Sequence, residues 1–385
     1  MNIVVVGGGF GGVKTALELS KRRVGKITLI SDVPYFLHHA TLYSTATGKN
    51  YAESVIPLED IFAHHPDVKV VKDRITDLDH HRKIVIGKKA QYSYDQLVLA
   101  LGSVTTFFGI PGMKQRAFGI KTLDEVKEFQ NHIHNEVIEK KLGREYFVIG
   151  AGPTGVELAA SLNEYLQSLI HLYRIKGARS RVTLVEAAPR ILPKMSKTAS
   201  RKVSKRLKQL GVRVWVNQRV ESLDDDCIVI DGQKYPTKTA VWTSGMANNP
   251  FFQRHDDLFS LNIQGRVVVD SHLEARPNIY VIGDGNDVKY SGMAWPALKQ
   301  ATHVAKNIAR KKSRKPLRRF WPKSVPTGVP VGGSWAYVEW HGLHVSGRLG
   351  HWVRRKMELY GYCQLVPLRV ALPIWRSHYL KNIDD

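Results

Sequence analysis

The chain has 385 residues, 43% of them hydrophobic and 24% charged, which suits two or three globular domains with sizeable cores. Its 57 Lys and Arg against 34 Asp and Glu give a formal charge of +23, which favours an acidic partner: anionic lipid, nucleic acid or an acidic protein. The two cysteines, Cys227 and Cys363, lack metal-ligand or CxxC spacing, which argues against a disulfide framework, a structural zinc and an iron–sulfur cluster. Since no apolar run approaches the roughly 18 residues of a spanning helix, we expect a soluble or membrane-surface protein.

The N-terminal stretch MNIVVVGGGFGG predicts a buried strand, a glycine turn and a helix from Val13 to about Arg22. Its spacing, Gly7-x-Gly9-x-x-Gly12, is typical of a dinucleotide-binding turn. The first glycine permits the turn, the second lets the backbone approach a pyrophosphate, and the third lets the helix pack on the strand. Because the strand leads directly into this turn, we expect no signal peptide.

A second strand, KITLIS, ends at Ser31-Asp32, and VPYFLHHATLYSTATG then predicts a loop and a helix, beside the first nucleotide or packed into the core. Short strands are predicted at Val68–Val71, Ile84–Ile86 and Tyr94–Leu99, the last closing on Gly102. A strand that ends in small residues and glycine typically returns the chain past the nucleotide. FFGIPG, residues 107–112, predicts a turn and a crossover to a second domain.

A helix from Leu123 to about Lys140 opens the second unit, and YFVIGAGPTGVEL then repeats the fingerprint as Gly150-x-Gly152-x-x-Gly155, with a helix through Leu172. RVTLVE places Glu186 at the end of the next strand, where a carboxylate accepts from a ribose 2′-OH. A single glycine cluster is compatible with an ordinary left-handed turn. Two copies in the same strand–turn–helix–strand order indicate two dinucleotides, FAD and a nicotinamide, with electrons passing between them.

A helix over Lys197–Leu210 and a strand over Val212–Val216 follow, and AVWTSGMANNP, residues 240–250, marks the return to the first domain. NIYVIGDGNDV predicts a buried strand ending in Gly283-Asp284-Gly285, whose acid can accept from a ribityl hydroxyl while the next helix, residues 296–310, points its N-terminus at the isoalloxazine. The predicted domains are 1–112 with 246–312 for FAD, 113–245 for the nicotinamide, and a C-terminal region, 313–385.

The C-terminal stretch differs in composition from the rest. Residues 310–385 hold 15 Lys and Arg against 4 Asp and Glu, and five of the eight tryptophans. Aromatic and basic residues around broken apolar stretches are typical of an interfacial membrane anchor. A small dimerisation domain with a solvated basic face is the alternative.

The order of these motifs resembles the two-dinucleotide-binding-domain flavoproteins, and among them the type II NADH dehydrogenases, which are single-chain NADH:quinone oxidoreductases. The resemblance covers roughly residues 1–310 and rests on VVVGGGFGG, LALGS, VIGAGPTGVELAASL, YVIGDGNDV and PALKQATHVAKNI. It implies an α/β fold of two Rossmann-like domains, FAD and NADH as cofactors, a membrane quinone as acceptor and no proton pumping. It also implies a peripheral place on the cytoplasmic side of the membrane, and it leaves a homodimer open.

The resemblance assigns residues to both nucleotides. For FAD they are Gly7, Gly9, Gly12, Ser31 or Asp32, Ala100, Gly102, Gly283, Asp284, Ala297 and Leu298. For NADH they are Gly150, Gly152, Thr154, Gly155, Glu186 and Gly245. An acid at position 186 repels a 2′-phosphate and so favours NADH over NADPH, with Arg190 nearby as an opposing charge. No metal is expected.

Four residues are candidates for the chemistry. Glu157 matches a family glutamate at the nicotinamide–flavin contact that is implicated in quinone-side proton coupling; a helix acid capping its first turn is the alternative. Gln300 fits the first glutamine of the family's Ala-Gln-x-x-x-Gln pattern and would hydrogen-bond a quinone carbonyl. Lys299, in place of the alanine, would stabilise reduced flavin, and His303 would exchange a proton with the quinone. Val304 replaces the second glutamine, which leaves open a kinship to the apoptosis-inducing-factor-like branch.

Other classes fit less well. A disulfide reductase needs a redox cysteine pair near residues 38–50, and a sulfide:quinone oxidoreductase needs reactive cysteines flanking the flavin; the chain has neither. A ferredoxin or rubredoxin reductase, whose partner is acidic, is the enzymatic alternative. A redox-sensing flavoprotein that binds nucleic acid is the non-enzymatic one, but the chain lacks a compact basic-aromatic module for sequence-specific recognition.

Overall fold

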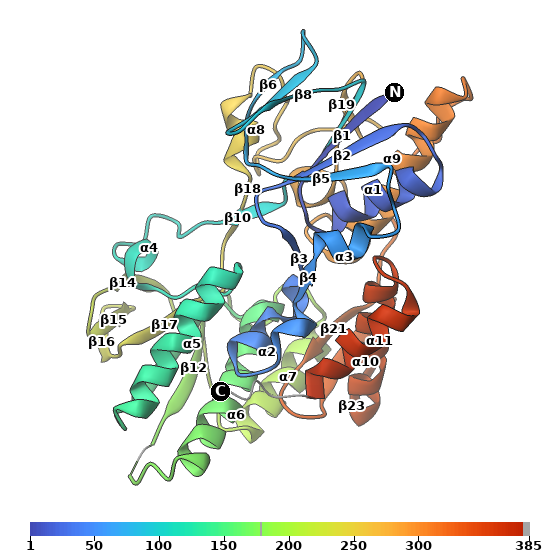
Figure 1. The fold of residues 1–385 in the computed structure, drawn as a ribbon. Helices are drawn as coiled ribbons and strands as arrows, with labels where there is room; N and C mark the ends of the chain where they lie inside the picture. Colours follow the sequence, from blue (N-terminus) through green and yellow to red (C-terminus); the bar gives the residue numbers. More distant parts are fainter. Residues whose placement is uncertain (178, 380–385) are drawn as a thin grey trace.

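The computed structural model describes residues 1–177 and 179–379, and its first unit is built on a six-stranded sheet (Figure 1). The sheet has the order β19-β20-β9-β1-β2-β5, in which only the edge strand β19 is antiparallel to its neighbour. The strands are β1 (Asn2–Val6), β2 (Lys26–Ser31), β5 (Val68–Lys72), β9 (Gln96–Leu99), β19 (Glu274–Arg276) and β20 (Ile279–Val281). Central strands of a parallel sheet are covered on both faces, which is why β1 and β9 read as continuous apolar runs.

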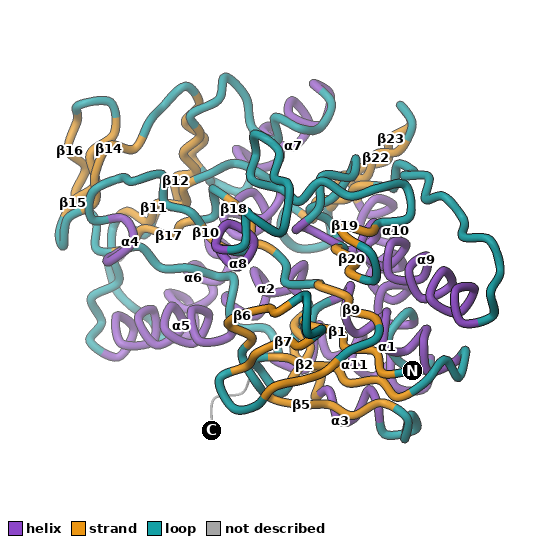
Figure 2. The backbone as a smooth tube through the Cα atoms, turned by 90° about the horizontal axis from the view of Figure 1, so that it is seen from above, coloured by secondary structure: helices purple, strands orange, loops and turns teal. Residues whose placement is uncertain are grey.

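Two helices far apart in the sequence cover one face of this sheet. They are α1 (Phe10–Lys21), which begins at the first glycine turn, and α9 (Ala294–Lys312), which follows the Gly283–Gly285 turn. Figure 2 shows the two helices side by side. The first unit is therefore built from two stretches of the chain, one before and one after the second unit.

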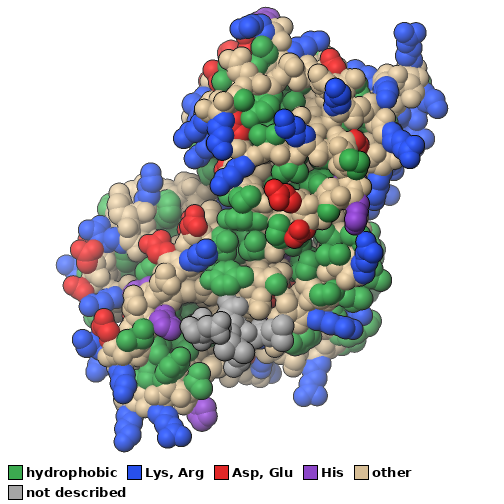
Figure 3. Space-filling model, in the orientation of Figure 1, with side chains coloured by type: hydrophobic (Ala, Val, Ile, Leu, Met, Phe, Trp, Pro, Cys, Tyr) green, Lys and Arg blue, Asp and Glu red, His purple; other side chains and the backbone are tan. Residues whose placement is uncertain are grey.

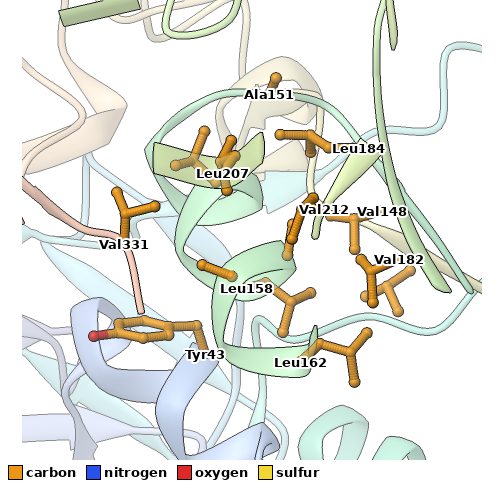
Figure 4. Packing of buried hydrophobic residues seen from close by; sticks show 14 of the residues in the cluster. Tyr43, Val148, Ala151, Leu158, Leu162, Val182, Leu184, Leu207, Val212 and Val331 are labelled. Atoms are coloured by element: carbon orange, nitrogen blue, oxygen red, sulfur yellow. The ribbon is translucent and has the colours of Figure 1, made fainter. Parts of the chain in front are cut away.

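The second unit has a parallel four-stranded sheet of order β13-β12-β11-β17. Its strands are β11 (Glu145–Ile149), β12 (Arg181–Glu186), β13 (Arg213–Val216) and β17 (Thr239–Trp242), and its helices are α5 (Leu123–Ile138), α6 (Pro153–Leu172) and α7 (Lys197–Gln209). Its core, drawn in Figure 4, also contains Tyr43 from the first unit and Val331 from the C-terminal region. The three parts of the chain thus share one apolar core.

Short, half-exposed strands carry little alternation, so most of the small elements were not predicted; the strand at residues 84–86 and a helix within residues 33–48 were. Two three-stranded antiparallel ribbons decorate the units, β6-β7-β8 on the first and β14-β15-β16 on the second. Their strands are β6 (Ile75–Asp79), β7 (Ile84–Gly87), β8 (Gln91–Ser93), β14 (Val220–Leu223), β15 (Cys227–Ile230) and β16 (Gln233–Pro236). The remaining short elements are β3 (Tyr35–Leu37), η1 (His39–Thr41), α2 (Leu42–Ala46), η2 (Tyr51–Glu53), β4 (Val55–Pro57), α3 (Leu58–Phe62), α4 (Met113–Arg116) and α8 (Pro250–Arg254).

The chain crosses between the units twice, and the crossings lie side by side. Strand β10 (Ser103–Thr105) leaves the first unit and pairs antiparallel with β18 (Met246–Asn248), which returns to it (Figure 1). Strand β18 lies within residues 240–250, which were interpreted as the return, and β10 lies just before residues 107–112, which were interpreted as the outward crossover.

The C-terminal region is a folded unit that packs against both other units. Strands β21 (Thr327–Pro330), β22 (Ala336–Trp340) and β23 (Leu343–Gly347) form an antiparallel sheet. They are followed by α10 (Arg348–Cys363), α11 (Leu368–Arg376) and η4 (Ser377–Tyr379). Tyr362, Leu365 and Ala371 join the core of the first unit, whereas Val329, Val331 and Tyr337 join that of the second. Across the described residues, no helix combines the length and the apolar character that crossing a bilayer demands.

Candidate functional site

The first glycine turn has the geometry that a bound pyrophosphate needs. Gly7 has a φ of +118°, and a Cβ on it would lie 2.2 Å from the carbonyl oxygen of Ala100. A Cβ on Gly12 would lie 1.9 Å from the carbonyl oxygen of Gly7. Gly9, by contrast, would place its Cβ more than 4 Å from any described heavy atom, and it caps α1 without a side-chain hydrogen bond. Packing therefore excludes a side chain at the outer two glycines, while the middle one borders open space at the helix N-terminus.

The second glycine turn repeats this geometry. Gly150 has a φ of +102°, and a Cβ on Gly155 would lie 1.8 Å from the Gly150 carbonyl oxygen. Gly152 caps α6 without a side-chain partner, and a Cβ there would meet no described atom within 4 Å. Thr154 is exposed in the first turn of the helix. Two sites of the same construction support binding of two dinucleotides.

Glu186 is held beside the second turn by two backbone donors. Its Oε2 accepts from the N–H of Ala151 at 2.7 Å, and its Oε1 accepts from that of Ala188 at 2.8 Å. The guanidinium of Arg190 is occupied elsewhere, since it donates to the carbonyl groups of residues 192 and 193 and to Ser200 Oγ. The carboxylate of Glu186 is therefore fixed beside the second turn, and the guanidinium of Arg190 is engaged in other hydrogen bonds.

The two residues predicted to meet the adenosine ribose of the first nucleotide differ in how far they are buried. Ser31 is buried, with its Oγ accepting from the Val33 N–H at 3.3 Å and lying 2.4 Å from where a Cβ on Gly8 would stand. Asp32 is exposed at the same strand end. Of the two candidates, the serine lies against the turn and the acid faces outward.

Asp284 lies in a polar cluster that the sequence reasoning had only partly identified. Ser103 Oγ donates to Asp284 Oδ2 at 2.9 Å, and Lys121 Nζ donates to the same Ser103 Oγ at 3.2 Å. Burial lowers the pKa of Lys121, while Asp284 and Glu125 act in the opposite direction. Ser103 ends the quoted LALGS motif and could have been noticed, but Lys121 belongs to no motif.

The other residues predicted to line the flavin lie after strands β9 and β20 and in helix α9. Ala100 contacts the Gly7 turn, Gly102 has a φ of +66°, and Gly283 has a φ of +76° with Ala297 beside it. Ala297 and Leu298 are buried in the first two turns of α9. Gly245 has a different reason to be glycine, because a Cβ there would lie 2.3 Å from the Thr106 carbonyl oxygen of the neighbouring crossover.

The predicted role of Gln300 is not supported by its contacts. Its amide is fully buried, its Oε1 accepts from the Gly283 N–H at 2.7 Å and from Asn286 Nδ2 at 3.0 Å, and its Nε2 donates to Ser291. These hydrogen bonds hold the Gly283–Gly285 turn. Gln300 therefore supports this turn in the structure, and its contact with a quinone stays a prediction.

Lys299 and His303 also lie elsewhere than predicted. Lys299 is exposed, with its Nζ 5.9 Å from the ring centroid of Trp295, which itself stacks on Tyr360 of α10. His303 packs edge-on against Phe320, 5.2 Å between ring centroids, and its Nε2 pairs with Asn307. Consecutive helix residues point about 100° apart, so neighbours such as 299 and 300 cannot share one face.

Glu157 is the one candidate for the chemistry that lies where the three parts of the chain meet. Its side chain is buried in the second turn of α6, too far along the helix to cap the first turn. Burial raises the pKa of Glu157 to about 8; Arg354 opposes this shift and Glu358 adds to it. Tyr43 of α2 lies nearby, and burial raises its pKa as well, with Glu157 as the next cause.

The C-terminal region supplies most of the charges around Glu157, which the sequence did not reveal. Arg354 Nη1 lies 2.9 Å from Glu358 Oε1, and Arg355 bridges Glu358 and Glu53, at 3.2 Å from the latter. His378 Nδ1 in turn lies 2.8 Å from Glu53 Oε1. In the sequence, the arginines of α10 were attributed to a lipid-facing surface. The i, i+3 and i, i+4 spacing to Glu358 was the available signal for ion pairs instead.

The chain belongs to the pyridine nucleotide-disulphide oxidoreductase family, whose model matches residues 1–306. The type II NADH:quinone oxidoreductase of Staphylococcus haemolyticus is 29% identical over 330 residues, covering 80% of this chain and 81% of that protein. The type II NADH:quinone oxidoreductase Ndh of Mycobacterium tuberculosis is 28% identical, covering 90% of this chain and 84% of that protein. These relatives bear out the resemblance that the motifs indicated.

Solved structures show the same fold. NDH2 from Plasmodium falciparum, in complex with NADH, matches with a TM-score of 0.84 at 16% identity, covering 98% of this chain and 97% of that one. The sulfide:quinone oxidoreductase of Aquifex aeolicus matches with a TM-score of 0.76 at 19% identity, covering 96% and 92%. In both cases the match includes the C-terminal region, which the family model does not reach. The predicted α/β fold with two Rossmann-like domains is thus confirmed.

Proposed function

We propose that this protein is an FAD-dependent NADH:quinone oxidoreductase that transfers two electrons to a membrane quinone without pumping protons. One observation carries the proposal: a buried carboxyl group, Glu157, lies in the helix that begins at one of two equivalent dinucleotide turns, and the C-terminal region closes over it. The named relatives, all type II NADH:quinone oxidoreductases, support the same assignment.

The two nucleotides fit different turns. The Gly7–Gly12 turn would hold the FAD pyrophosphate on the N-terminus of α1, with Asp284 and its partner Ser103 at the ribityl side. The Gly150–Gly155 turn would hold the NADH pyrophosphate, with Glu186 on the ribose. Because Arg190 is tied to residues 192, 193 and 200, its charge is not free for a 2′-phosphate, which favours NADH over NADPH. Bound FAD supplies acceptance of a hydride and release of two electrons.

The role of Glu157 would be to deliver a proton. Its pKa, raised to about 8, means that the carboxyl group carries a proton at neutral pH. Reduction of a quinone consumes two protons, and a neutral carboxylic acid at the site can donate one of them to a quinone oxygen. After Glu157 has donated its proton, the positive charge of Arg354 nearby stabilises the carboxylate that remains.

Sulfide oxidation, the reaction in the name of the Aquifex aeolicus protein, is not favoured for this chain. Cys227 lies on β15 in the outer ribbon of the second unit, and Cys363 lies at the end of α10. Both are free thiols, and the chain holds no third cysteine. Without a pair of thiols at the flavin, neither disulfide nor sulfide chemistry has a protein nucleophile there.

The quinone would arrive from a membrane on which the C-terminal region lies, at the cytoplasmic side. Figure 3 shows hydrophobic side chains on the side where α10 and α11 lie in Figure 1, with Lys and Arg around them. The exposed apolar residues of these helices and of the β22–β23 hairpin are Trp340, Leu343, Leu349, Trp352, Tyr360, Leu368 and Val370. Apolar side chains flanked by cations suit an anionic lipid surface.

Steady-state kinetics tests the proposed function. Purified, FAD-loaded protein is assayed for NADH oxidation with and without a short-chain quinone, and with NADPH as the control donor. Fast turnover that requires the quinone and prefers NADH is the expected result. Rapid bleaching of the flavin by NADH without quinone turnover would point to a protein acceptor, and no bleaching at all would refute the nicotinamide assignment.

A further inference from the structure

The charged side chains at the junction of the three parts are unequal in number. Among the described residues, three acids meet there, Glu53 from η2, Glu157 from α6 and Glu358 from α10, but only two guanidinium groups, Arg354 and Arg355. All five are buried, with exposed fractions of 8% or less. The five groups are electrically balanced only when one of the acids carries a proton.

The contacts show which acid is left over. Glu53 is bound by Arg355 and by His378, and it also accepts from Ser44 Oγ at 3.1 Å. Glu358 is bound by both arginines, through Oε1 to Arg354 and through Oε2 to Arg355. Within the described part of the chain, Glu157 has no cation within 4 Å, although Arg354 is near enough to influence it. The acid without an ion-pair partner is therefore Glu157.

We propose that Glu358 is a positioning residue for quinone reduction. By holding the guanidinium of Arg354 in an ion pair, Glu358 keeps Glu157 from pairing with that cation. Glu157 therefore stays protonated and can donate its proton to the quinone. The inference rests on the proposed function, since it concerns the step in which the quinone receives a proton. It assigns to α10, in the C-terminal region, control over the protonation of a side chain in α6.

The other titratable groups facing this cluster do not provide a competing charge. On α2, Tyr43 is buried, and burial raises its pKa, so it stays neutral. Tyr362 of α10 donates to the Glu53 carbonyl oxygen, and burial keeps it neutral as well. Burial lowers the pKa of His38 to about 3, so this imidazole is uncharged. His378 is bound to Glu53, and burial lowers the pKa of His351 of α10. Arg354 and Glu358 are therefore the charges that decide the state of Glu157.

The two partners should act in opposite directions. Removing the charge of Glu358 leaves Arg354 unpaired, so its attraction for a carboxylate at position 157 increases and the pKa of Glu157 falls. Removing the charge of Arg354 leaves two neighbouring acids without the cation between them, so the pKa of Glu157 rises. A general loss of packing would not lower the pKa of Glu157 in one variant and raise it in the other.

The experiment follows the reoxidation of reduced, FAD-loaded enzyme by a short-chain quinone in a stopped-flow instrument, from about pH 5 to about pH 10. In the unchanged protein the rate should fall with rising pH through an apparent pKa near 8, and Glu157→Gln should remove this titration. Glu358→Gln should lower the apparent pKa by about one to three units, and Arg354→Gln should raise it. Glu358→Asp should restore most of the original value.

Two controls keep the outcome decisive. Glu18→Gln removes another buried helix acid, paired with Lys14 and Arg22 in α1, and should leave the pH profile unchanged. If Glu358→Gln does not fold, the upward shift in Arg354→Gln decides the question. An unchanged apparent pKa in Glu358→Gln, or in Arg354→Gln, would overturn the inference. Quinone turnover by the unchanged protein tests the proposed function separately, because it does not depend on either variant.

Discussion

Two substitutions in the second glycine turn should separate folding from nucleotide binding. Gly152 lies at φ −69° and ψ −179°, which alanine adopts readily, and its Cβ would point into open space. Gly152→Ala should therefore cost about 1 kcal/mol of stability or less, the difference between the two residues as helix N-caps. The same methyl group occupies the place where a pyrophosphate must approach the backbone, so we expect NADH to bind at least about tenfold more weakly, or about 1.4 kcal/mol.

Gly155→Ala should behave in the opposite way. Its Cβ would lie 1.8 Å from the Gly150 carbonyl oxygen and 2.6 Å from Thr243 Oγ1, and the first of these contacts is with rigid backbone. The helix must move away from the strand, and we expect a loss of about 3 kcal/mol or more in the free energy of unfolding.

Denaturant unfolding and NADH titration of each variant, both in the FAD-loaded protein, check this pair. The first glycine turn offers a matched control, because Gly9→Ala changes the other open position and should weaken FAD retention while leaving NADH affinity intact. Unchanged NADH affinity in Gly152→Ala would refute the assignment of this turn to NADH. Unchanged stability in Gly155→Ala would refute the packing argument.

Three further predictions concern the flavin site, the buried histidine and the membrane surface. Lys121→Met should raise the dissociation constant of FAD several-fold, because it removes the cation that donates to Ser103, the partner of Asp284. Fluorescence titration of released FAD measures this, and Lys127→Met, which changes an exposed lysine of α5, is the control. Burial lowers the pKa of His38 to about 3, below its value of about 6.5 in the unfolded chain. Between these two pH values the unfolded state binds more protons than the folded state, so the folded state loses stability as pH falls below about 6.5. His38→Gln should remove this loss of stability, which amounts to about 2 kcal/mol at pH 5. Equal slopes of the unfolding free energy against pH in the variant and the unchanged protein would contradict the prediction. Trp352→Glu should strongly reduce flotation with anionic liposomes. Ile263→Glu, which changes an exposed apolar residue of the first unit, should leave flotation unchanged. Equal liposome binding by both variants would argue against α10 as part of the membrane-binding surface.

The sequence determined the parts of this protein whose geometry is local. A Cβ on Gly12 would lie 1.9 Å from the Gly7 carbonyl oxygen, and a Cβ on Gly155 would lie 1.8 Å from that of Gly150. Both turns therefore exclude a side chain, so glycine spacing alone located them. The strands on either side are buried on both faces and therefore show as apolar runs. Helix α6 accordingly ends at Leu172, as its periodicity predicted.

For three neighbouring candidates on one helix, the structure gives surroundings that the sequence did not indicate. Lys299, Gln300 and His303 were grouped because they are close in sequence, but rotation along α9 places them in solvent, in the turn at Gly283 and against Phe320. A motif gives the spacing of side chains along a helix. It does not give the surroundings into which each side chain is placed.

The chemistry at Glu157 was decided by the tertiary structure. Its position was visible in the GVEL tract, but its surroundings come from Tyr43, more than a hundred residues earlier, and from Arg354 and Glu358, about two hundred residues later. Burial and the pairing of charges depend on which surfaces dock, and no local pattern records how α10 packs over α6 and α2. The sequence alone therefore identified two glycine turns and a glutamate, while only the docking of the C-terminal region buries that glutamate near Arg354 and Glu358 and so raises its pKa.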